Sequence, residues 1–252
     1  MTDEAALLYT IRDMPDDDTP RLVYADYVEG RDGPGDTEFA EFIRVQIEFA
    51  RHPHANDILS ADYDARDGIS DLWQRGFNLQ SRERELWPAV RGRFEGAGYF
   101  AVSGFPVQDY HDPATLPLVL IRRGLPAEVR GPLAAMVGDG RTPGIVAELR
   151  RSWPVVRAVA VDKKPLKFDG RFLWHNAEHR LTSSEHDNDT RPPDHLPAEL
   201  FNRLSGFIPR DAHVTDAVRG WPTEPAAFNA LSTAIIAMAD GQIAKGVEHA
   251  TR

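Results

Sequence analysis

Two adjoining segments near the N-terminus, residues 16–27 and 38–46, constrain the fold more than any other part of this chain. Thr19-Pro20 predicts the start of a helix, because a threonine hydroxyl can cap the first backbone N–H groups and proline fits the first helical turn. The three aspartates at 16–18 place negative charge at the positive end of that helix's dipole. The two segments therefore predict two helices separated by a short connection.

The connections between these helices are also marked in the sequence. Gly30 stands where a C-terminal cap is expected, and residues 31–36, rich in glycine and proline, predict a loop. Mostly apolar side chains recur at helical spacing after this loop, and a shorter row precedes residue 16. The two rows are Phe39, Phe42, Ile43, Gln46, Ile47 and Ala50, and Ala5, Leu8 and Ile11. We expect residues 1–52 to form three helices joined by tight turns.

These motifs resemble the bacterial repeat-companion domain, a family of uncharacterised proteins. The family pattern is an acidic turn followed by three short motifs and a glutamine. In this chain the pattern is Thr19-Pro20-Arg21-Leu22, Ala25-Asp26-Tyr27 and Glu41-Phe42-Ile43-Arg44, with Gln46 two residues on. Tyr27 replaces the family's usual tryptophan, and the loop carries an additional Gly33-Pro34-Gly35. The resemblance covers residues 4–51 and implies a helical module, but no chemistry, because the family has no established activity.

Four charged residues of these motifs, Arg21, Asp26, Glu41 and Arg44, have two interpretations. They could form a charged recognition site on the helical surface. We favour a semi-buried ion-pair network that orients the helices, because paired charges tolerate burial that lone charges do not.

The composition excludes several classes of protein. A chain without cysteine forms no disulfides, no thiolate zinc or iron–sulfur sites, and has no thiol nucleophile. No apolar run approaches the roughly 20 residues that a membrane-spanning helix needs. The first residues are acidic and lack the charge pattern of a signal peptide. We expect a cytoplasmic protein with no membrane partner and no cofactor.

The net charge of −10 is unevenly distributed along the chain. Residues 1–75 carry 18 acidic and 7 basic side chains, whereas residues 76–180 carry 11 acidic and 16 basic ones. The two segments could attract each other within one chain or between copies. The basic segment at 150–171 could also bind nucleic acid. Because the chain as a whole is acidic, we do not expect nucleic acid to be its main partner.

The spacing of apolar residues changes along the chain, and this change divides the chain into three segments. Residues 1–55 are the helical module, residues 56–97 a helical connector, and residues 98–252 a mixed α/β domain. In the connector, Pro88 is expected to end or bend a helix. The predicted class is α+β (or mixed α/β): an N-terminal three-helix module followed by a small sheet and a C-terminal helix.

Strands are predicted at residues 99–102, 127–130 and 155–161, of which the last is β-branched and alternating. Two short helices, at residues 132–137 and 143–153, separate the second strand from the third. Strands 30 residues apart with a helical return resemble one turn of a leucine-rich-repeat-like β/α unit. A solenoid needs several such units, so we expect a small mixed layer.

The C-terminal segment contains weaker signals. A strand is predicted at residues 168–174, a polar loop at 182–193 and a short amphipathic helix at 196–204. The last helix is expected to begin after Thr223 and to end near Gly241, with its apolar stripe on the sheet.

One motif resembles a catalytic signature. Residues 175–179 fit H-x-x-E-H, in which His175 and His179 on one helical face could bind zinc and Glu178 could act as general base. The motif follows a predicted strand and leads into a polar loop, which favours a chance match. Phosphate-binding loops and the nucleophile elbow of serine hydrolases are missing from the sequence.

The sequence therefore predicts a non-enzymatic protein-interaction or scaffold protein, whose partner is a protein. A metal-dependent hydrolase using His175, Glu178 and His179 is the alternative, and nucleic-acid binding through the basic middle segment is a third hypothesis. The oligomeric state stays open at this point.

Overall fold

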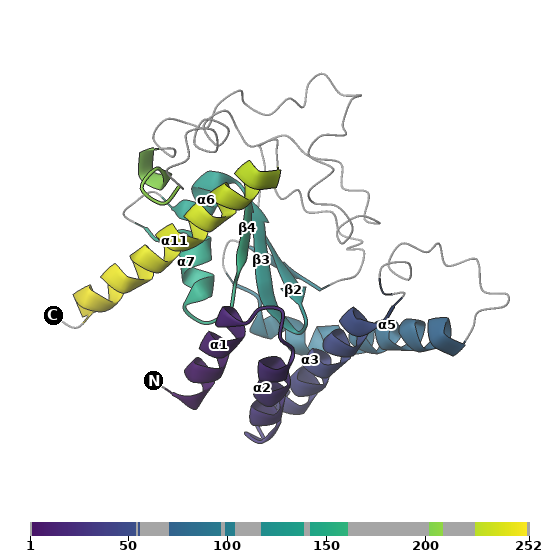
Figure 1. The fold of residues 1–252 in the computed structure, drawn as a ribbon. Coiled ribbons are helices and arrows are strands. Elements are labelled where there is room, and N and C mark those ends of the chain that lie inside the picture. Colours follow the sequence, from purple (N-terminus) through teal and green to yellow (C-terminus); the bar gives the residue numbers. More distant parts are fainter. Residues whose placement is uncertain are drawn as a thin grey trace.

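The computed structural model describes residues 2–53, 55, 71–96, 99–103, 117–138, 142–160, 202–208 and 225–250. These residues form an α+β fold in which N-terminal helices precede a four-stranded mixed sheet and a long C-terminal helix (Figure 1). The predicted fold class is confirmed.

The N-terminal part contains the three predicted helices, α1 (Asp3–Asp13), α2 (Thr19–Glu29) and α3 (Asp36–Arg51). The predicted cap of α2 is wrong in detail: Thr19 is the first helical residue, and Asp18 precedes it as the N-cap. The backbone N–H of Thr19 donates to Oδ1 of Asp17 at 2.8 Å. A carboxylate satisfies this N–H and also carries the charge that the helix dipole favours, so the threonine hydroxyl is not needed as an acceptor.

A further helix, α5 (Asp71–Val90), packs along α3 and leads into the short 3-10 helix η1 (Arg91–Arg93). Pro88 lies inside α5, so the helix does not end at this proline, and the alternative prediction that it bends there stays a prediction. A proline so close to a helix end removes one backbone hydrogen bond while little helix remains to be disrupted.

The sheet has the order β1-β2-β3-β4. Its strands are β1 (Phe100–Val102), β2 (Leu118–Arg122), β3 (Leu125–Gly131) and β4 (Arg157–Ala160). β2 and β3 form an antiparallel hairpin, whereas β1–β2 and β3–β4 are parallel pairs. Helices α6 (Leu133–Val137) and α7 (Ile145–Arg150) form the return between β3 and β4, and Val129 pairs with Ala158. The strand–helix–strand unit is therefore present as a parallel pair.

One cluster of buried hydrophobic side chains joins the N-terminal helices to the sheet. The rings of Phe39 and Phe42 lie 5.6 and 6.3 Å from that of Phe94, which follows η1. The ring of Phe94 in turn lies 5.4 Å from that of Trp153, after α7. The helical module and the α/β part therefore share a core, whereas the boundaries predicted at residues 55 and 97 stay predictions.

The C-terminal helix α11 (Pro225–Ala250) packs against β4 and α7. Oγ of Ser232 accepts the backbone N–H of Ala158 in β4 at 3.0 Å. Arg150 of α7 donates two hydrogen bonds to the Asp240 carboxylate, at 2.9 and 2.8 Å. The helix thus lies against both the sheet and the return helix, on the left of Figure 1.

Contrary to the prediction, α11 does not end near Gly241. A glycine inside a helix costs only about 1 kcal/mol relative to alanine. The next residue, Gln242, donates to the carbonyl of Val137 at 3.0 Å, so this turn of α11 is held against the end of α6.

The strand predicted at 168–174, the loop at 182–193 and Thr223 lie outside the described residues. Among the described helices, none combines the length and apolar character needed to cross a membrane.

Candidate functional site

The charged residues singled out from the sequence lie on α2 and α3. Nη2 of Arg44 contacts the carboxylates of Asp26 and Glu29 at 2.6 and 2.7 Å. Glu41 accepts two hydrogen bonds from Arg82 of α5, at 2.7 and 2.8 Å. These bonds, together with the charge of Arg44, hold the pKa of Glu41 below its usual value. Asp26 and Arg44 therefore link α2 to α3, and Glu41 and Arg82 link α3 to α5.

Arg21 lies apart from these three, at the buried start of α2. Its Nη1 donates to the carbonyl of Asp17 at 3.0 Å. Burial lowers the pKa of the Arg21 guanidinium, and the charge of Arg123 lowers it further. The neighbouring Asp18 lies 2.7 Å from Nε of Arg51 and 3.3 Å from Nη1 of Arg123. These charges connect the start of α2 to the end of α3 and to the β2–β3 turn.

A pocket of about 550 Å³ opens between α2, α3 and α5. Its apolar lining comes from Leu22 of α2, Ile47 of α3, Pro53 and Leu72 of α5. Ile47 is buried, whereas Leu72 is exposed. Nε2 of His52 lies 2.9 Å from the carbonyl oxygen of Leu72, which fixes the start of α5 beside the end of α3.

Charged side chains surround this apolar lining. Arg44, Glu48 and Arg51 follow one another at intervals of four and three residues, so they lie on one face of α3, and Arg75 faces them from α5. Nη2 of Arg75 lies 2.5 Å from Oε1 of Glu48. The pocket lining thus contains three arginines and one glutamate.

The carboxylates that hold two of these arginines lie outside the lining. Arg44 contacts Asp26 and Glu29 through Nη2 alone, and Arg51 contacts Asp18 through Nε. A guanidinium has five N–H donors, so these contacts leave donors for a ligand in the pocket. The ion pairs fix the direction of each guanidinium without using its whole hydrogen-bonding capacity.

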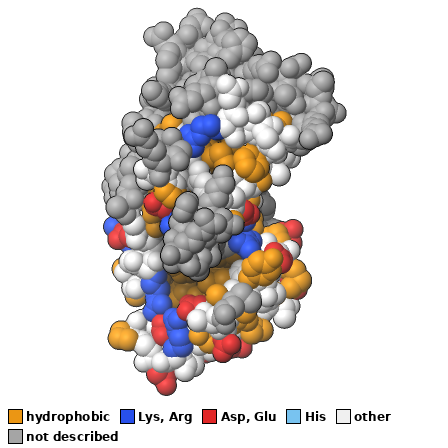
Figure 2. Space-filling view, turned by 90° about the vertical axis from the view of Figure 1, so that its left-hand side faces the viewer, with side chains coloured by type: hydrophobic (Ala, Val, Ile, Leu, Met, Phe, Trp, Pro, Cys, Tyr) orange, Lys and Arg blue, Asp and Glu red, His pale blue; other side chains and the backbone are white. Residues whose placement is uncertain are grey.

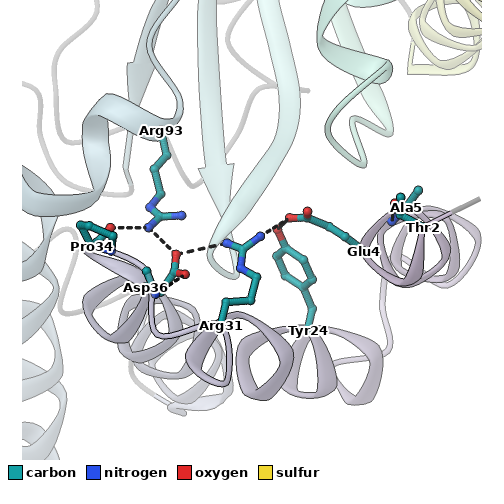
Figure 3. A network of polar contacts seen from close by, with 9 residues as sticks. Thr2, Glu4, Ala5, Tyr24, Arg31, Pro34, Asp36 and Arg93 are labelled. Carbon is teal, nitrogen blue, oxygen red and sulfur yellow. Dashed lines mark hydrogen bonds and ion pairs between the residues drawn. The ribbon is translucent and has the colours of Figure 1, made fainter.

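A second polar network fixes the connection between α2 and α3 (Figure 3). The buried carboxylate of Asp36 accepts from Arg31 at 3.1 Å and from Arg93 at 2.6 Å. Arg31 also contacts Glu4 of α1 at 3.1 Å, and Tyr24 donates to the same Glu4 oxygen at 3.0 Å. Although burial acts to raise it, the pKa of Asp36 lies below its usual value because Arg93 and Arg31 donate to the carboxylate. The two arginines balance the two carboxylates.

A buried polar contact holds the β2–β3 turn against the helices. Oε1 of Gln46 accepts the backbone N–H of Gly124 at 2.5 Å, and Nε2 of Gln46 donates to Glu83 of α5 at 2.6 Å. Glu83 also accepts from the hydroxyl of Ser103 at 2.6 Å. Gln46 therefore joins α3, α5 and the hairpin, a role that its place in a mostly apolar row did not predict.

The surface of the N-terminal helices combines charge with exposed apolar side chains. Tyr9, Met14 and Val23 are each exposed. Figure 2 shows hydrophobic, acidic and basic side chains interspersed over the lower part of the molecule, where Figure 1 places these helices. Such a mixed surface is compatible with protein contacts.

The H-x-x-E-H residues His175, Glu178 and His179 lie outside the described residues. Within the part of the chain that the structure describes, no group of three or more His, Asp or Glu side chains is arranged to hold a metal ion. Comparison of the chain with protein-family models, with curated proteins and with solved structures finds no match.

Sequence reasoning selected Arg44 but missed the other arginines of the pocket. Arg51 lies seven residues after Arg44, a spacing that places both on one helical face. Arg75 belongs to a different helix, and no local pattern links it to α3. The pocket forms only because α5 packs beside α3, and the spacing of apolar residues along the sequence does not predict this packing.

Proposed function

We propose that this chain is a non-enzymatic protein-interaction module and that the pocket between α2, α3 and α5 is its docking site. The observation that carries the proposal is the pairing of an apolar lining with three arginines whose carboxylate partners lie mostly outside it. Arginine is enriched among the residues that dominate binding energy in protein interfaces, usually next to a well-packed apolar pocket.

The occupant that fits this lining is a short segment of a partner protein with an aliphatic side chain beside one or two carboxylates. The aliphatic side chain would contact Leu22, Ile47 and Leu72. A carboxylate next to it would accept hydrogen bonds from the arginine donors that the ion pairs leave available. A volume of about 550 Å³ accommodates a few side chains, not a whole element of secondary structure.

The nucleic-acid hypothesis has less support. Two arginines of the basic segment at 150–171 have partners within the protein: Arg150 is bound to Asp240, and Arg157 lies 3.9 Å from Glu128. Binding through phosphates would weaken steeply with added salt, so a salt titration separates the two hypotheses.

We also infer that the N-terminal helices are a repeat-companion module. The support is that α1, α2 and α3 lie where the motifs of that family predict helices. This inference adds no activity to the proposal.

Peptide display against the purified chain tests the docking site. We expect enrichment of peptides in which an aliphatic residue adjoins aspartate or glutamate. Affinity of the selected peptides, measured by fluorescence anisotropy, should fall at least about tenfold in the double variant Arg44→Glu/Arg75→Glu, because each reversal replaces an attraction by a repulsion.

The matched control reverses two exposed arginines outside the pocket, in Arg91→Glu/Arg151→Glu. This control should bind the same peptides as the unmodified chain. If no sequence is enriched, or if both double variants bind equally well, the pocket is not a docking site.

A further inference from the structure

One carboxylate lies inside the docking pocket between α2, α3 and α5. Of the described residues that line the pocket, Glu48 alone is acidic, and it stands on α3 four residues after Arg44 and three before Arg51. The carboxylates that hold these two arginines lie outside the lining. Glu48 therefore places a negative charge in the same lining that the partner's acidic group is proposed to contact.

Glu48 is bound to Arg75 of α5. Nε and Nη2 of Arg75 donate to the same oxygen, Oε1 of Glu48, at 3.1 and 2.5 Å. These two donors form one edge of the guanidinium, and such an edge can pair with both oxygens of a carboxylate, with one hydrogen bond to each. Here a single oxygen uses the edge, so a ligand carboxylate that approaches it side-on would make the better-matched pair.

The Glu48–Arg75 pair is accessible and easily separated. The side chains of Arg75 and Glu48 are 67% and 46% exposed. Water screens the charges of such a pair, and two long side chains lose rotamer freedom when they are held together, so an exposed pair contributes little to stability. An incoming carboxylate can therefore displace Glu48 from Arg75 while the neighbouring helices stay in place.

The three arginines of the lining differ in what a ligand does to them. Arg44 and Arg51 keep their carboxylate partners when a ligand binds, because those partners lie outside the lining. Arg75 exchanges its partner, because Glu48 and the ligand carboxylate need the same edge of its guanidinium. The ligand thus adds contacts at two arginines and replaces a contact at the third.

We propose that Glu48 is an internal competitor in the docking pocket, which occupies Arg75 until the carboxylate of a partner segment replaces it. This inference rests on the proposed docking function and assigns a regulatory role to one residue of that site. In the free chain, Glu48 also offsets the repulsion among the arginines of the lining. The competition lowers the affinity for acidic segments, and a segment with amides in place of carboxylates gains nothing from displacing Glu48.

Fluorescence anisotropy of the full chain with two labelled peptides tests the competition. One peptide has a leucine flanked by glutamates, and the other has glutamines in their place. Glu48→Gln should strengthen binding of the glutamate peptide about three- to tenfold, because it frees Arg75 and removes a repulsive charge. The affinity for the glutamine peptide should change by less than about twofold, so a double-mutant cycle isolates the coupling between Glu48 and the ligand carboxylates.

Asp26→Asn is the matched comparison, because it also removes one carboxylate from an arginine of the lining, but from outside the pocket. It should give no gain in affinity for the glutamate peptide. Equal gains in Asp26→Asn and Glu48→Gln would show a general effect of charge and overturn the proposal.

The two proposals fail in distinguishable ways. If Arg44→Glu/Arg75→Glu weakens binding of the glutamate peptide but Glu48→Gln does not strengthen it, the docking function stands and the competition is refuted. If the glutamate peptide binds neither the unmodified chain nor Glu48→Gln, both proposals are refuted.

Discussion

The N-terminal helices and the outer face of the sheet use charged side chains in opposite ways. Around Asp36, two arginines meet two carboxylates, and the arginines remain partly exposed. Among the described residues, Glu128 pairs with Arg130 and Arg122 and lies near Arg157, and both Glu128 and Arg130 are buried. The first arrangement is complete by itself and fixes how helices meet. The second places charged groups where water cannot screen them well.

The difference matters because exposed and buried ion pairs contribute differently to the free energy of unfolding. An exposed pair contributes about 0–1 kcal/mol, since water screens the charges. Removing one partner of a buried pair costs about 3–5 kcal/mol, because the remaining charge is left desolvated. Substitutions in the two regions should therefore change the free energy of unfolding by different amounts.

Because the N-terminal helices and the sheet share one hydrophobic core, we expect them to unfold together, and Gly124→Ala tests this. Gly124 has φ +85°, and a Cβ there would lie 2.5 Å from the Cα of Ile43 on α3. We expect a loss of about 4 kcal/mol in the free energy of unfolding, from the strained backbone and the clash. Urea unfolding followed by far-ultraviolet circular dichroism and by tryptophan fluorescence should show coincident transitions.

Gly92→Ala is the matched control for Gly124→Ala. A Cβ at Gly92 would meet no atom within 4 Å, so stability should be nearly unchanged. Separate transitions for the two probes would show that the helices and the sheet are independent units.

The next largest effect is expected for Glu128→Gln. The variant removes the carboxylate that pairs with the buried Arg130 and should lower the free energy of unfolding by about 3 kcal/mol at neutral pH. Glu95→Gln removes a carboxylate from an exposed pair with Arg91 and should change stability little. Equal effects of the two substitutions would remove the distinction between buried and exposed charge.

Lowering the pH should remove the same stabilising contribution of the Glu128 carboxylate. Burial alone would raise the pKa of Glu128, but Arg130 and Arg122 outweigh burial and hold it below its usual value of 4.5. A carboxyl with a lowered folded-state pKa stabilises the protein above its unfolded-state pKa and loses this contribution as pH falls. The stability of the unmodified chain should therefore drop below about pH 4.5, and more steeply than that of Glu128→Gln, in urea titrations from pH 6 to 3.

Asp36→Asn probes the balanced network and should have an intermediate effect. The amide cannot pair with the charges of Arg31 and Arg93, and we expect a loss of about 1–2 kcal/mol. Glu38→Gln, an exposed position in the same helical turn, is the control. Thermal unfolding of the two variants measures the difference, and a loss as large as that of Glu128→Gln would contradict the comparison.

The smallest effect is expected for Asp26→Asn. The Asp26 side chain is 73% exposed, and Arg44 keeps its second partner, Glu29. The free energy of unfolding should change by less than about 0.5 kcal/mol in urea titration. A loss above 1 kcal/mol would indicate that the Asp26–Arg44 pair orients the helices, as the sequence motif suggested.

The N-terminal helices could be predicted because the start, the end and the apolar face of a helix depend on residues that are close in sequence. Pro20, Gly30 and the apolar spacing of α3 each act within a turn or two, and the three N-terminal helices follow. Gly241 gave a wrong prediction of the helix end. The free-energy cost of a glycine inside the helix is offset by the hydrogen bond from Gln242 to Val137, a residue that is distant in sequence. The end of α11 could therefore not be predicted from the residues of the helix alone.

The candidate site and the buried charges of the sheet were less accessible to sequence reasoning. Arg75 reaches the pocket only through the packing of α5, and Glu128 meets Arg157 only through a parallel register across an intervening return. The hairpin turn at Arg123 and Gly124 shows the same limit, because no local pattern predicts the hydrogen bond from Gly124 to Gln46. Each of these features depends on which elements become neighbours.

The position of α11 in the chain has a consequence for biosynthesis. Its buried face, which includes Leu231, Ala234 and Ile235, completes the hydrophobic core against α7 and β4. A ribosome releases this helix after the four strands of the sheet, so a nascent chain carries an uncovered core surface until residues 225–250 have been synthesised. Chaperones that bind exposed apolar surface would meet the chain in this interval, and a stalled or shortened transcript would leave a product prone to aggregate.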